Sequence, residues 1–159
     1  MFRITRVLSL GPFATAERAE LLLDRGVTHV LNVSDTPGIV GRAFRESAWV
    51  PVKDYCRIPD ETAIAFLNTL HRMASEPDSH VYVHCMAGRQ RGPTVLWLYL
   101  IACGLDQITA REIIETRSPE AIAGFPWLVD ERLVMSAQKH GLARFLPLSR
   151  GEVIVPHDG

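Results

Sequence analysis

The chain has 159 residues, of which 47% are apolar, and a formal net charge of −1. This length favours a single domain with one buried core, and the near-zero charge gives no reason to expect nucleic-acid binding, which usually shows as a basic excess. The three cysteines include no Cys-x-x-Cys pair, which argues against a disulfide framework or a zinc ribbon and favours a reducing compartment.

The chain begins with short β-like runs on either side of one helical run. Residues 2–10 predict a strand or short hairpin, and residues 14–25 repeat apolar side chains with a helical period. Residues 28–33 are rich in β-branched side chains and predict a buried strand.

The next stretch is ambiguous. Residues 39–48 favour a short exposed helical piece, and residues 49–52 predict a strand. Pro51 places that strand at an edge or a strand end, because proline cannot donate to a hydrogen-bond ladder. A helix should follow from Asp60, which is a plausible N-cap, and end before Pro77. Its apolar face consists of Ala63, Phe66, Leu67, Leu70, Met73 and Ala74.

The second half of the chain predicts one strand and then helices. Residues 81–84 form a short apolar run typical of a strand, and residues 95–103 are apolar on every side, which indicates a buried helix. Thr109 and Glu112 form a capping box for a helix over residues 109–117. A last helix is expected over residues 127–140.

Strands that alternate with helices up to Cys85, followed by further helices, indicate an α/β fold. We expect one domain over residues 1–145, with a C-terminal tail over residues 146–159. Its core should be a central, mostly parallel sheet of four to five strands, flanked by helices on both faces. Ligand sites in such sheets lie at the carboxyl ends of the strands, where Cys85 is expected.

The loop from Cys85 to Arg91 holds the residues that favour phosphate chemistry. Five residues separate the two side chains, and a helix follows directly. Backbone N–H groups at a helix N-terminus can surround a tetrahedral oxyanion, and an arginine fork can clamp two of its oxygens. The same positive field favours thiolate over thiol, so Cys85 should be nucleophilic.

The motif His84-Cys85-x-x-Gly88-x-x-Arg91 resembles the signature of the cysteine-dependent protein tyrosine phosphatase superfamily. The order of elements over about residues 5–140 is similar to that of its compact dual-specificity branch. The resemblance implies a phosphate-binding loop between a strand and a buried helix, a phosphocysteine formed on Cys85, and no metal or other cofactor. The expected phosphate-binding residues are Met86, Ala87, Gly88, Arg89, Gln90 and Arg91, with His84 and Gly92 in support.

The resemblance also implies an aspartic acid that protonates the leaving oxygen and then activates water. Asp54 is our candidate, because it follows a predicted strand and lies 31 residues before Cys85. Asp60 is the competitor, although its interpretation as a helix cap is favoured. Asp35, in the loop after the second predicted strand, is a third choice.

The loop departs from the family pattern at three positions. The family usually has serine or threonine directly after the arginine, where its hydroxyl stabilises the departing thiolate, whereas this chain has Gly92. We therefore expect slow turnover with accumulation of the phosphocysteine. Arg89 resembles the basic residue of phosphatases that act on phospholipids, unless it points to solvent or pairs with a carboxylate. Gln90 replaces a small residue and can reshape the pocket.

Three functional hypotheses follow. The leading one is a phosphomonoester hydrolase that acts on phosphotyrosine, phosphoserine or phosphothreonine proteins, or on a more anionic phospholipid. The second is a phosphate-binding pseudophosphatase with little turnover, and the third is a rhodanese-like sulfurtransferase. A reversible disulfide between Cys56 and Cys85 is open, although a packed loop cysteine is favoured for Cys56.

The same residues set the expected partners and location. The partner is a phosphorylated protein or an anionic phosphorylated small molecule or lipid, and nucleic acid is not expected. Charges interrupt the first six residues, and the apolar segment 95–103 is about half the length needed to span a bilayer. We therefore expect no signal peptide, no integral membrane segment, a cytoplasmic location and a monomer.

Overall fold

A computed structural model describes residues 1–38 and 43–142 of the chain. In these residues the elements follow in the order β1 (Phe2–Arg3), β2 (Leu8–Gly11), α1 (Ala16–Asp24), β3 (His29–Asn32), β4 (Glu46–Trp49), α2 (Asp60–Ser75), β5 (Val81–His84), α3 (Arg91–Ala102), α4 (Gln107–Arg117) and α5 (Glu131–His140). The chain begins with the hairpin β1–β2, as one of the two predicted alternatives for residues 2–10 requires.

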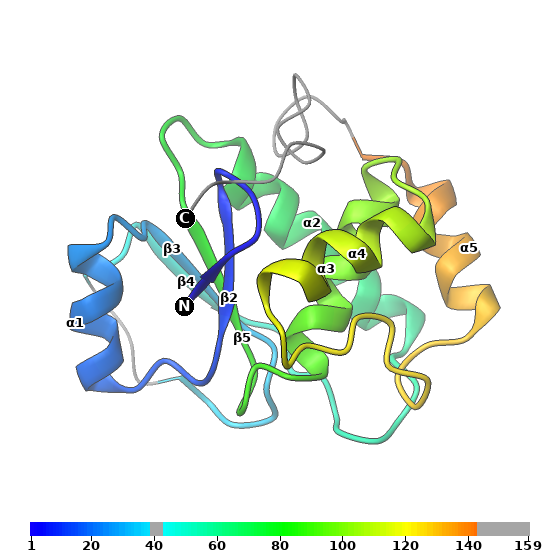
Figure 1. Cartoon of the computed structure of the whole chain (residues 1–159), viewed down its shortest axis with the longest axis horizontal. Helices are drawn as coiled ribbons and strands as arrows, with labels where there is room; N and C mark the ends of the chain where they lie inside the picture. The colour runs from blue at the N-terminus through cyan, green and yellow to red at the C-terminus, as the bar shows by residue number, and fades with distance from the viewer. Residues whose placement is uncertain (39–42, 143–159) are drawn as a thin grey trace.

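The strands of the described residues form one sheet in the order β1-β2-β5-β3-β4 (Figure 1). Only the pairing of β1 with β2 is antiparallel among these neighbours. The register places Gly11, His84, Asn32 and Trp49, the last residues of four strands, in one row. The carboxyl ends of the parallel strands therefore meet at one edge of the sheet, directly before Cys85. The predicted sheet, mostly parallel, is confirmed.

Helices cover both faces of this sheet, as expected. Successive side chains of a strand point to opposite faces. In β5, Val81 and Val83 belong to the large core cluster, whereas Tyr82 belongs to a smaller cluster with Leu22 of α1. Figure 1 shows α1 on one side of the sheet and α2, α3, α4 and α5 on the other.

Helix α3 is the centre of the larger helical layer. All 12 of its residues are buried, and α2, α4 and α5 pack around it. A helix that is apolar on every side is stable only where protein surrounds it. The buried helix predicted from residues 95–103 is therefore confirmed, and so is the apolar face of α2, whose six predicted residues are its buried ones.

The prediction between β3 and α2 is wrong. Glu46–Trp49 form β4, whereas we expected helix up to residue 48 and a strand over residues 49–52. The side chains of β4 alternate between half-buried and exposed, because successive side chains of a strand point to opposite faces of the sheet. β4 is an edge strand, and such strands tolerate polar residues. Pro51 follows the edge strand β4, which agrees with the prediction that this proline marks an edge strand or a strand end. Residues 39–42, the start of the expected helical piece, lie outside the described residues.

Three predicted helix starts are also wrong. Pro59 is the N-cap of α2, so Asp60 is its first residue instead of its cap. Asp106 caps α4 by accepting a 2.9 Å hydrogen bond from the N–H of Thr109, which is therefore the capped residue and not the cap. Asp130 caps α5 in the same way, so that helix begins four residues later than expected. In α4 and α5 an aspartate carboxylate satisfies an orphan N–H group of the first turn, which sets the start.

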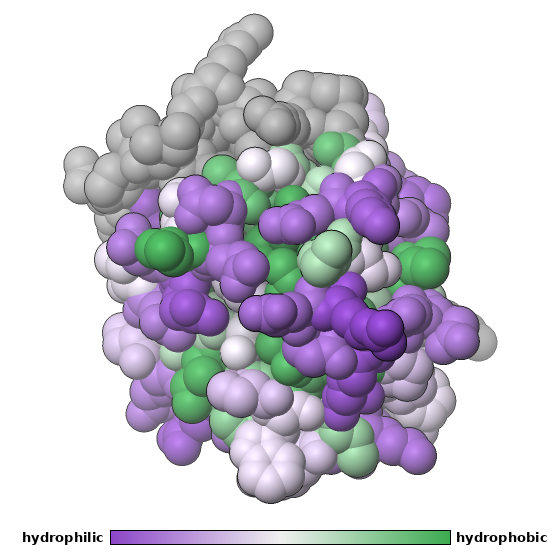
Figure 2. All heavy atoms as spheres, turned by 90° about the vertical axis from the view of Figure 1, so that its right-hand side faces the viewer, coloured by the Kyte–Doolittle hydropathy of each residue, from purple (hydrophilic) through white to green (hydrophobic). Residues whose placement is uncertain are grey.

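The described helices differ from membrane spans in length and composition. No helix within residues 1–38 and 43–142 is long and apolar enough to cross a bilayer. The helical face shown in Figure 2 is mostly hydrophilic, with separate hydrophobic side chains. The expected domain boundary at residue 145 and the tail over residues 146–159 lie outside the described residues.

Candidate functional site

The loop between β5 and α3 lines a pocket of about 220 Å³. The lining residues are Asp54, Tyr55, Cys85, Met86, Ala87, Arg89, Gln90 and Arg91. The loop leads into the first turn of α3, and its N-cap residue Gln90 makes no side-chain capping bond. The first turn of α3 thus has no side-chain cap, and a helix N-terminus next to a pocket favours an anion.

Gly88 turns the loop and lies against the chain that follows β2. Its φ of +75° is in the left-handed region, and a Cβ there would lie 2.7 Å from the carbonyl carbon of Gly11. The N–H of Phe13 donates to the Met86 carbonyl oxygen at 2.9 Å. Residues 11–13 thus support the loop from behind, which explains why Gly88 is absent from the pocket lining while its neighbours are present.

A second segment, far along the chain, holds the other side of the loop. The N–H of Ile122 donates to the Arg89 carbonyl oxygen at 2.7 Å. The Arg89 guanidinium forms an exposed ion pair with Glu120 at 3.2 Å. Of the alternatives for Arg89, the pairing with a carboxylate is therefore the one observed, although Arg89 also lines the pocket.

Arg91 is buried at the base of the pocket and has three partners. Its Nη1 donates to Asp35 Oδ1 at 2.9 Å and to the Val52 carbonyl oxygen at 3.2 Å, and its Nη2 lies 3.7 Å from Asp54 Oδ2. The hydrogen bond from Arg91 lowers the pKa of Asp35. These partners fix the plane of the guanidinium, which is the group suited to clamp two phosphate oxygens.

Asp54 and Asp60 occupy different environments. Asp54 lines the pocket, and its Oδ1 is shielded from solvent without a hydrogen-bond partner in the described part of the chain. Asp60 lies outside the lining and accepts a hydrogen bond from Arg57 at 3.1 Å. The geometry therefore brings Asp54, and not Asp60, to the loop of Cys85.

The cysteines also differ in environment. All three are free: Cys56 is exposed, whereas Cys85 and Cys103 are buried. Burial raises the pKa of Cys103 to about 11, which keeps it a thiol at neutral pH. Cys56 is exposed and absent from the pocket lining, so its favoured interpretation as a packed loop cysteine is wrong, and the alternative of a reversible disulfide with Cys85 stays a prediction.

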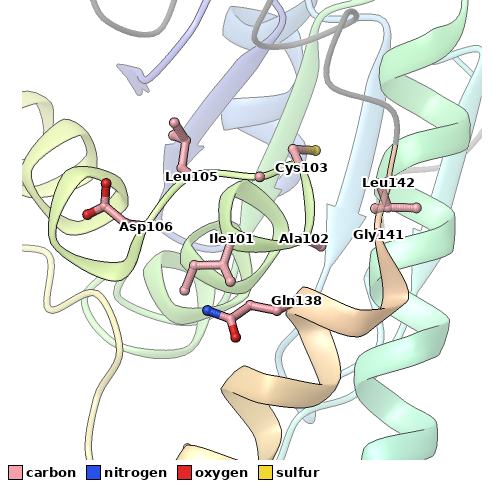
Figure 3. A pocket seen from close by; sticks show the side chains of 9 residues that line it. Ile101, Ala102, Cys103, Leu105, Asp106, Gln138, Gly141 and Leu142 are labelled. Atoms are coloured by element: carbon pink, nitrogen blue, oxygen red, sulfur yellow. The ribbon is translucent and has the colours of Figure 1, made fainter.

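A larger pocket, of about 380 Å³, lies beside Cys103 between the C-terminal ends of α3 and α5 (Figure 3). Ile101, Leu105 and Leu142 contribute apolar walls, and Asp106 and Gln138 contribute polar groups. Its lining, which lies within the described residues, contains no basic side chain, so it offers no counter-charge for a phosphate. Of these two pockets, the one at Cys85 is therefore the better anion site.

His84 is fully buried behind Cys85 and acts on the backbone of the loop. Its Nδ1 lies 3.1 Å from the Cys85 carbonyl oxygen, which can only accept, so Nδ1 carries the proton. The Phe13 ring packs edge-on against the imidazole at 4.9 Å, and Nε2 is buried without a partner among the described residues. Burial lowers the pKa of His84 to about 4, so the ring is neutral at physiological pH.

Gly92 leaves space beside the sulfur that Thr94 does not fill. A Cβ on Gly92 would lie 3.7 Å from Cys85 Sγ and 2.9 Å from Leu10 Cδ1. The Thr94 hydroxyl instead accepts from the Phe125 N–H at 3.1 Å and donates to the Ile122 carbonyl oxygen at 3.4 Å. Thr94 is thus committed to the 122–125 segment, in line with the expectation that it does not replace a hydroxyl at position 92.

The other histidines in the described part of the chain have structural partners. His71 pairs with the Tyr99 hydroxyl at 2.9 Å, His80 with the Ser9 hydroxyl at 2.5 Å, and His140 with Asn68 at 2.7 Å. Within residues 1–38 and 43–142, no group of three or more His, Cys, Asp or Glu side chains is placed to hold a metal ion.

Two contributors to the site were not identified from the sequence in their observed roles. Asp35 was considered only as an acid, but it is the closest carboxylate partner of Arg91. Its position directly after a parallel strand was the available signal, because such positions meet at one edge of the sheet. Tyr55, next to Asp54, lines the pocket and carried no motif that would have indicated it.

Comparisons with known proteins bear on the family and the fold. A sequence model of the family described as "Swiss Army Knife protein, DSP-PTPase phosphatase domain" matches residues 7–141. The chain is 33% identical over 95 residues to the protein-tyrosine-phosphatase IBR5 of Arabidopsis thaliana. That match covers 59% of this chain and 34% of the relative, so the chain spans about a third of the relative's length.

Solved structures share the fold. A point variant of human DUSP28 superposes with a TM-score of 0.72 and 23% identity, covering 87% of this chain and 93% of that one. PTPMT1, crystallised in complex with PI(5)P, superposes with a TM-score of 0.69 and 19% identity, covering 87% and 94%. At these identities the two structures indicate the fold alone.

Proposed function

The chain belongs to the family of dual-specificity (DSP-PTPase) phosphatase domains, and on that basis we propose that it hydrolyses phosphomonoesters through a phosphocysteine. One observation carries the proposal: a single pocket is lined by Cys85, Arg91 and Asp54, at the N-terminus of a buried helix. These side chains supply a nucleophile, an anion clamp and a proton donor, which are the groups that phosphoryl transfer to sulfur requires.

In the first step, the Cys85 thiolate attacks phosphorus while Arg91 and the loop N–H groups hold the nonbridging oxygens. The sulfur–phosphorus bond forms as the ester oxygen–phosphorus bond breaks. Asp54 donates its proton to the departing oxygen, so an alcohol or a phenol leaves instead of its anion. The positive groups stabilise charge on the transferring phosphoryl group, the usual source of acceleration in this chemistry.

In the second step, the Asp54 carboxylate takes a proton from water as the water oxygen attacks phosphorus. The phosphorus–sulfur bond breaks, inorganic phosphate forms, and Cys85 returns to the thiolate. Asp54 is again protonated for the next cycle. This step is the one that Gly92 slows, because no hydroxyl at that position donates to the leaving sulfur.

A second candidate function is phosphate binding with little turnover, and Gly92 is the observation that favours it. A chain whose pocket binds the phosphate ester with little or no transfer of the phosphoryl group would act mainly by capturing phosphorylated partners. Single-turnover measurements separate the two functions, because a binding module releases no alcohol from its substrate.

For the substrate, two classes follow from the relatives. Phosphorylated proteins fit the tyrosine phosphatase relative, and a phospholipid fits the structural neighbour crystallised with PI(5)P. Arg89 was the sequence feature that suggested a more anionic substrate, but Glu120 offsets its charge at 3.2 Å. We therefore favour phosphate esters with a single phosphate group.

The test is hydrolysis of an aryl phosphate by the purified chain, with Cys85→Ser and Cys56→Ser compared in parallel. We expect vanadate-sensitive release of phosphate that Cys85→Ser abolishes and that Cys56→Ser, an exposed cysteine outside the pocket, retains. Activity that survives Cys85→Ser would refute the mechanism.

The proton donor is tested separately with Asp54→Asn and Asp60→Asn. Asp54→Asn should lower kcat by about 100-fold or more with little change in affinity for inorganic phosphate, as expected for loss of a general acid. Asp60→Asn should retain activity, because its partner is the surface residue Arg57. The reverse pattern would assign the acid to Asp60.

A further inference from the structure

Tyr55 has an unusual backbone conformation at the entrance of the pocket. Its φ is +55°, and among described residues other than glycine only Asp78 shares a positive φ. Bulky side chains rarely adopt this region, and such positions cluster at functional sites. The side chain is 60% exposed yet lines the pocket beside Asp54. The fold thus holds a large aromatic ring at the mouth instead of burying it.

Two further rings extend the surface that Tyr55 begins. The Tyr55 ring lies 6.4 Å from Phe125 and 6.2 Å from Trp127, both in edge-to-face arrangements. Trp127 is 64% exposed. We call these three residues the aromatic wall.

Backbone hydrogen bonds fix the wall to the site. The N–H of Phe125 donates to the Thr94 hydroxyl at 3.1 Å, which ties the segment to the first turns of α3. The N–H of Ile58 donates to the Leu128 carbonyl oxygen at 2.8 Å, which ties the loop of Tyr55 to the segment of Trp127. The rings are therefore presented on two joined segments and not on separate loops.

Two basic side chains on the segments around the mouth, Arg89 and Arg57, form ion pairs. Arg89 pairs with Glu120, and Arg57 pairs with both Asp60 and Asp130. A highly anionic headgroup would require basic groups free of such partners. The mouth instead offers aromatic surface, continued by Met86, which is 46% exposed and lines the pocket.

The chemistry fixes which part of a substrate meets the aromatic wall. The phosphate occupies the loop, and the leaving oxygen must lie within reach of Asp54. The atoms bonded to that oxygen then pass beside Tyr55, the next residue in the chain. A planar ring in this position can make edge-to-face and stacked contacts, whereas a short alkyl chain cannot.

We propose that Tyr55, Phe125 and Trp127 form a subsite for an aromatic leaving group, so that the enzyme prefers phosphotyrosine to phosphothreonine and to phosphoinositides. The proposal rests on the proposed function, since it names the substrate class of the same pocket. It makes Tyr55 and Trp127 determinants of specificity and leaves the phosphate loop unchanged.

The test compares two peptides with the same flanking sequence, one with phosphotyrosine and one with phosphothreonine. Tyr55→Ala and Trp127→Ala should lower kcat/KM for the phosphotyrosine peptide about tenfold and threefold, with less than a twofold change for phosphothreonine. Tyr55→Phe, which keeps the ring, should retain the preference. Ile108→Ala, a distant exposed apolar residue, is the matched control. Equal losses on both peptides would overturn the proposal.

The sign of the effect separates the subsite from accidental damage to Asp54. An alkoxide is the poorer leaving group, so a damaged general acid lowers phosphothreonine turnover more than phosphotyrosine turnover. Loss of the subsite should instead lower phosphotyrosine turnover more than phosphothreonine turnover. Vanadate inhibition should stay within twofold in all four variants, because vanadate contacts the phosphate loop and not the aromatic wall.

Failure of the proposed function has a different signature. If the unmodified chain hydrolyses no phosphomonoester, the proposed function fails, and the subsite is tested by calorimetry on Cys85→Ser. The subsite predicts about tenfold tighter binding of phenyl phosphate than of inorganic phosphate, lost in Tyr55→Ala. Equal affinities would overturn it. So would binding of PI(5)P-containing vesicles that depends on Trp127 and outcompetes phenyl phosphate, because this would assign the rings to a membrane surface.

Discussion

Replacing Gly92 with serine should accelerate the second half of the reaction. A Cβ at this position would lie 3.7 Å from Cys85 Sγ, so a hydroxyl one bond further reaches the sulfur within hydrogen-bonding distance in a suitable rotamer. A hydrogen bond to a charged acceptor contributes about 1.5–3 kcal/mol, which corresponds to about a 10- to 100-fold faster departure of the thiolate. The new Cβ also lies 2.9 Å from Leu10 Cδ1, so the end of that flexible side chain must shift.

The assay is a burst experiment with an aryl phosphate under rapid mixing. The unmodified chain should release close to one equivalent of phenol quickly and then turn over slowly. Gly92→Ser should leave the burst unchanged and accelerate the slow phase by about 10- to 100-fold. Gly92→Ala is the matched control, because it introduces the same Cβ and the same crowding of Leu10 without a hydroxyl.

The reasoning fails if Gly92→Ser turns over no faster than Gly92→Ala. It also fails if the unmodified chain shows no burst, since the first step would then limit the rate and the hydroxyl at position 92 would have nothing to accelerate.

Other predictions concern the supports of the phosphate loop. Asp35→Ala should weaken inhibition by inorganic phosphate about fivefold, because an exposed partner of Arg91 contributes about 1 kcal/mol or less; unchanged or tighter binding would show that the carboxylate only competes with phosphate. Gly88→Ala should lower the free energy of unfolding by about 2–4 kcal/mol in urea titrations, since positive φ and a backbone clash add, whereas Gly26→Ala, with an open site and a positive φ, should cost about 1 kcal/mol. Burial lowers the pKa of His84 to about 4, so the unfolded chain binds a proton between pH 6.5 and 4 that the folded chain does not. The free energy of unfolding should therefore decrease as the pH is lowered from 6.5 to 4, with a contribution of up to about 3 kcal/mol from His84 that His84→Asn should remove; an unchanged slope would contradict this account.

Local sequence patterns predicted the helices whose apolar side chains must be buried. The apolar face of α2 and the all-apolar run of α3 could be placed from periodicity, because burial leaves a helix no alternative partner for those surfaces. The position of Cys85 at the end of a strand was predicted from the short apolar run of residues 81–84 that precedes it. The sequence favoured Asp54 over Asp60 as the proton donor without deciding between them, and the pocket lining, which includes Asp54 and not Asp60, supports that choice.

Other features depend on contacts between residues that are far apart in the sequence. The strand β4 begins with the polar residues Glu46 and Ser47, which give no strand signal, and its pairing with β3 identifies it as a strand. The bond between Arg91 and Asp35 joins residues 56 positions apart, so no local pattern contains it. Helix starts at Asp106 and Asp130 were misplaced because several polar residues in a row can cap, and the geometry of the preceding turn decides which one does.

The two supports of the phosphate loop come from opposite ends of the described chain. Phe13 binds the Met86 carbonyl, and Ile122 binds the Arg89 carbonyl. During synthesis, Phe13 has already been added to the chain when the loop is made. Ile122 follows only after about 30 further residues, which take roughly two to six seconds of translation. The proposed activity should therefore appear only after residue 122 has been synthesised. Measured on ribosome-bound chains of increasing length, onset of vanadate-sensitive hydrolysis would report closure of the domain.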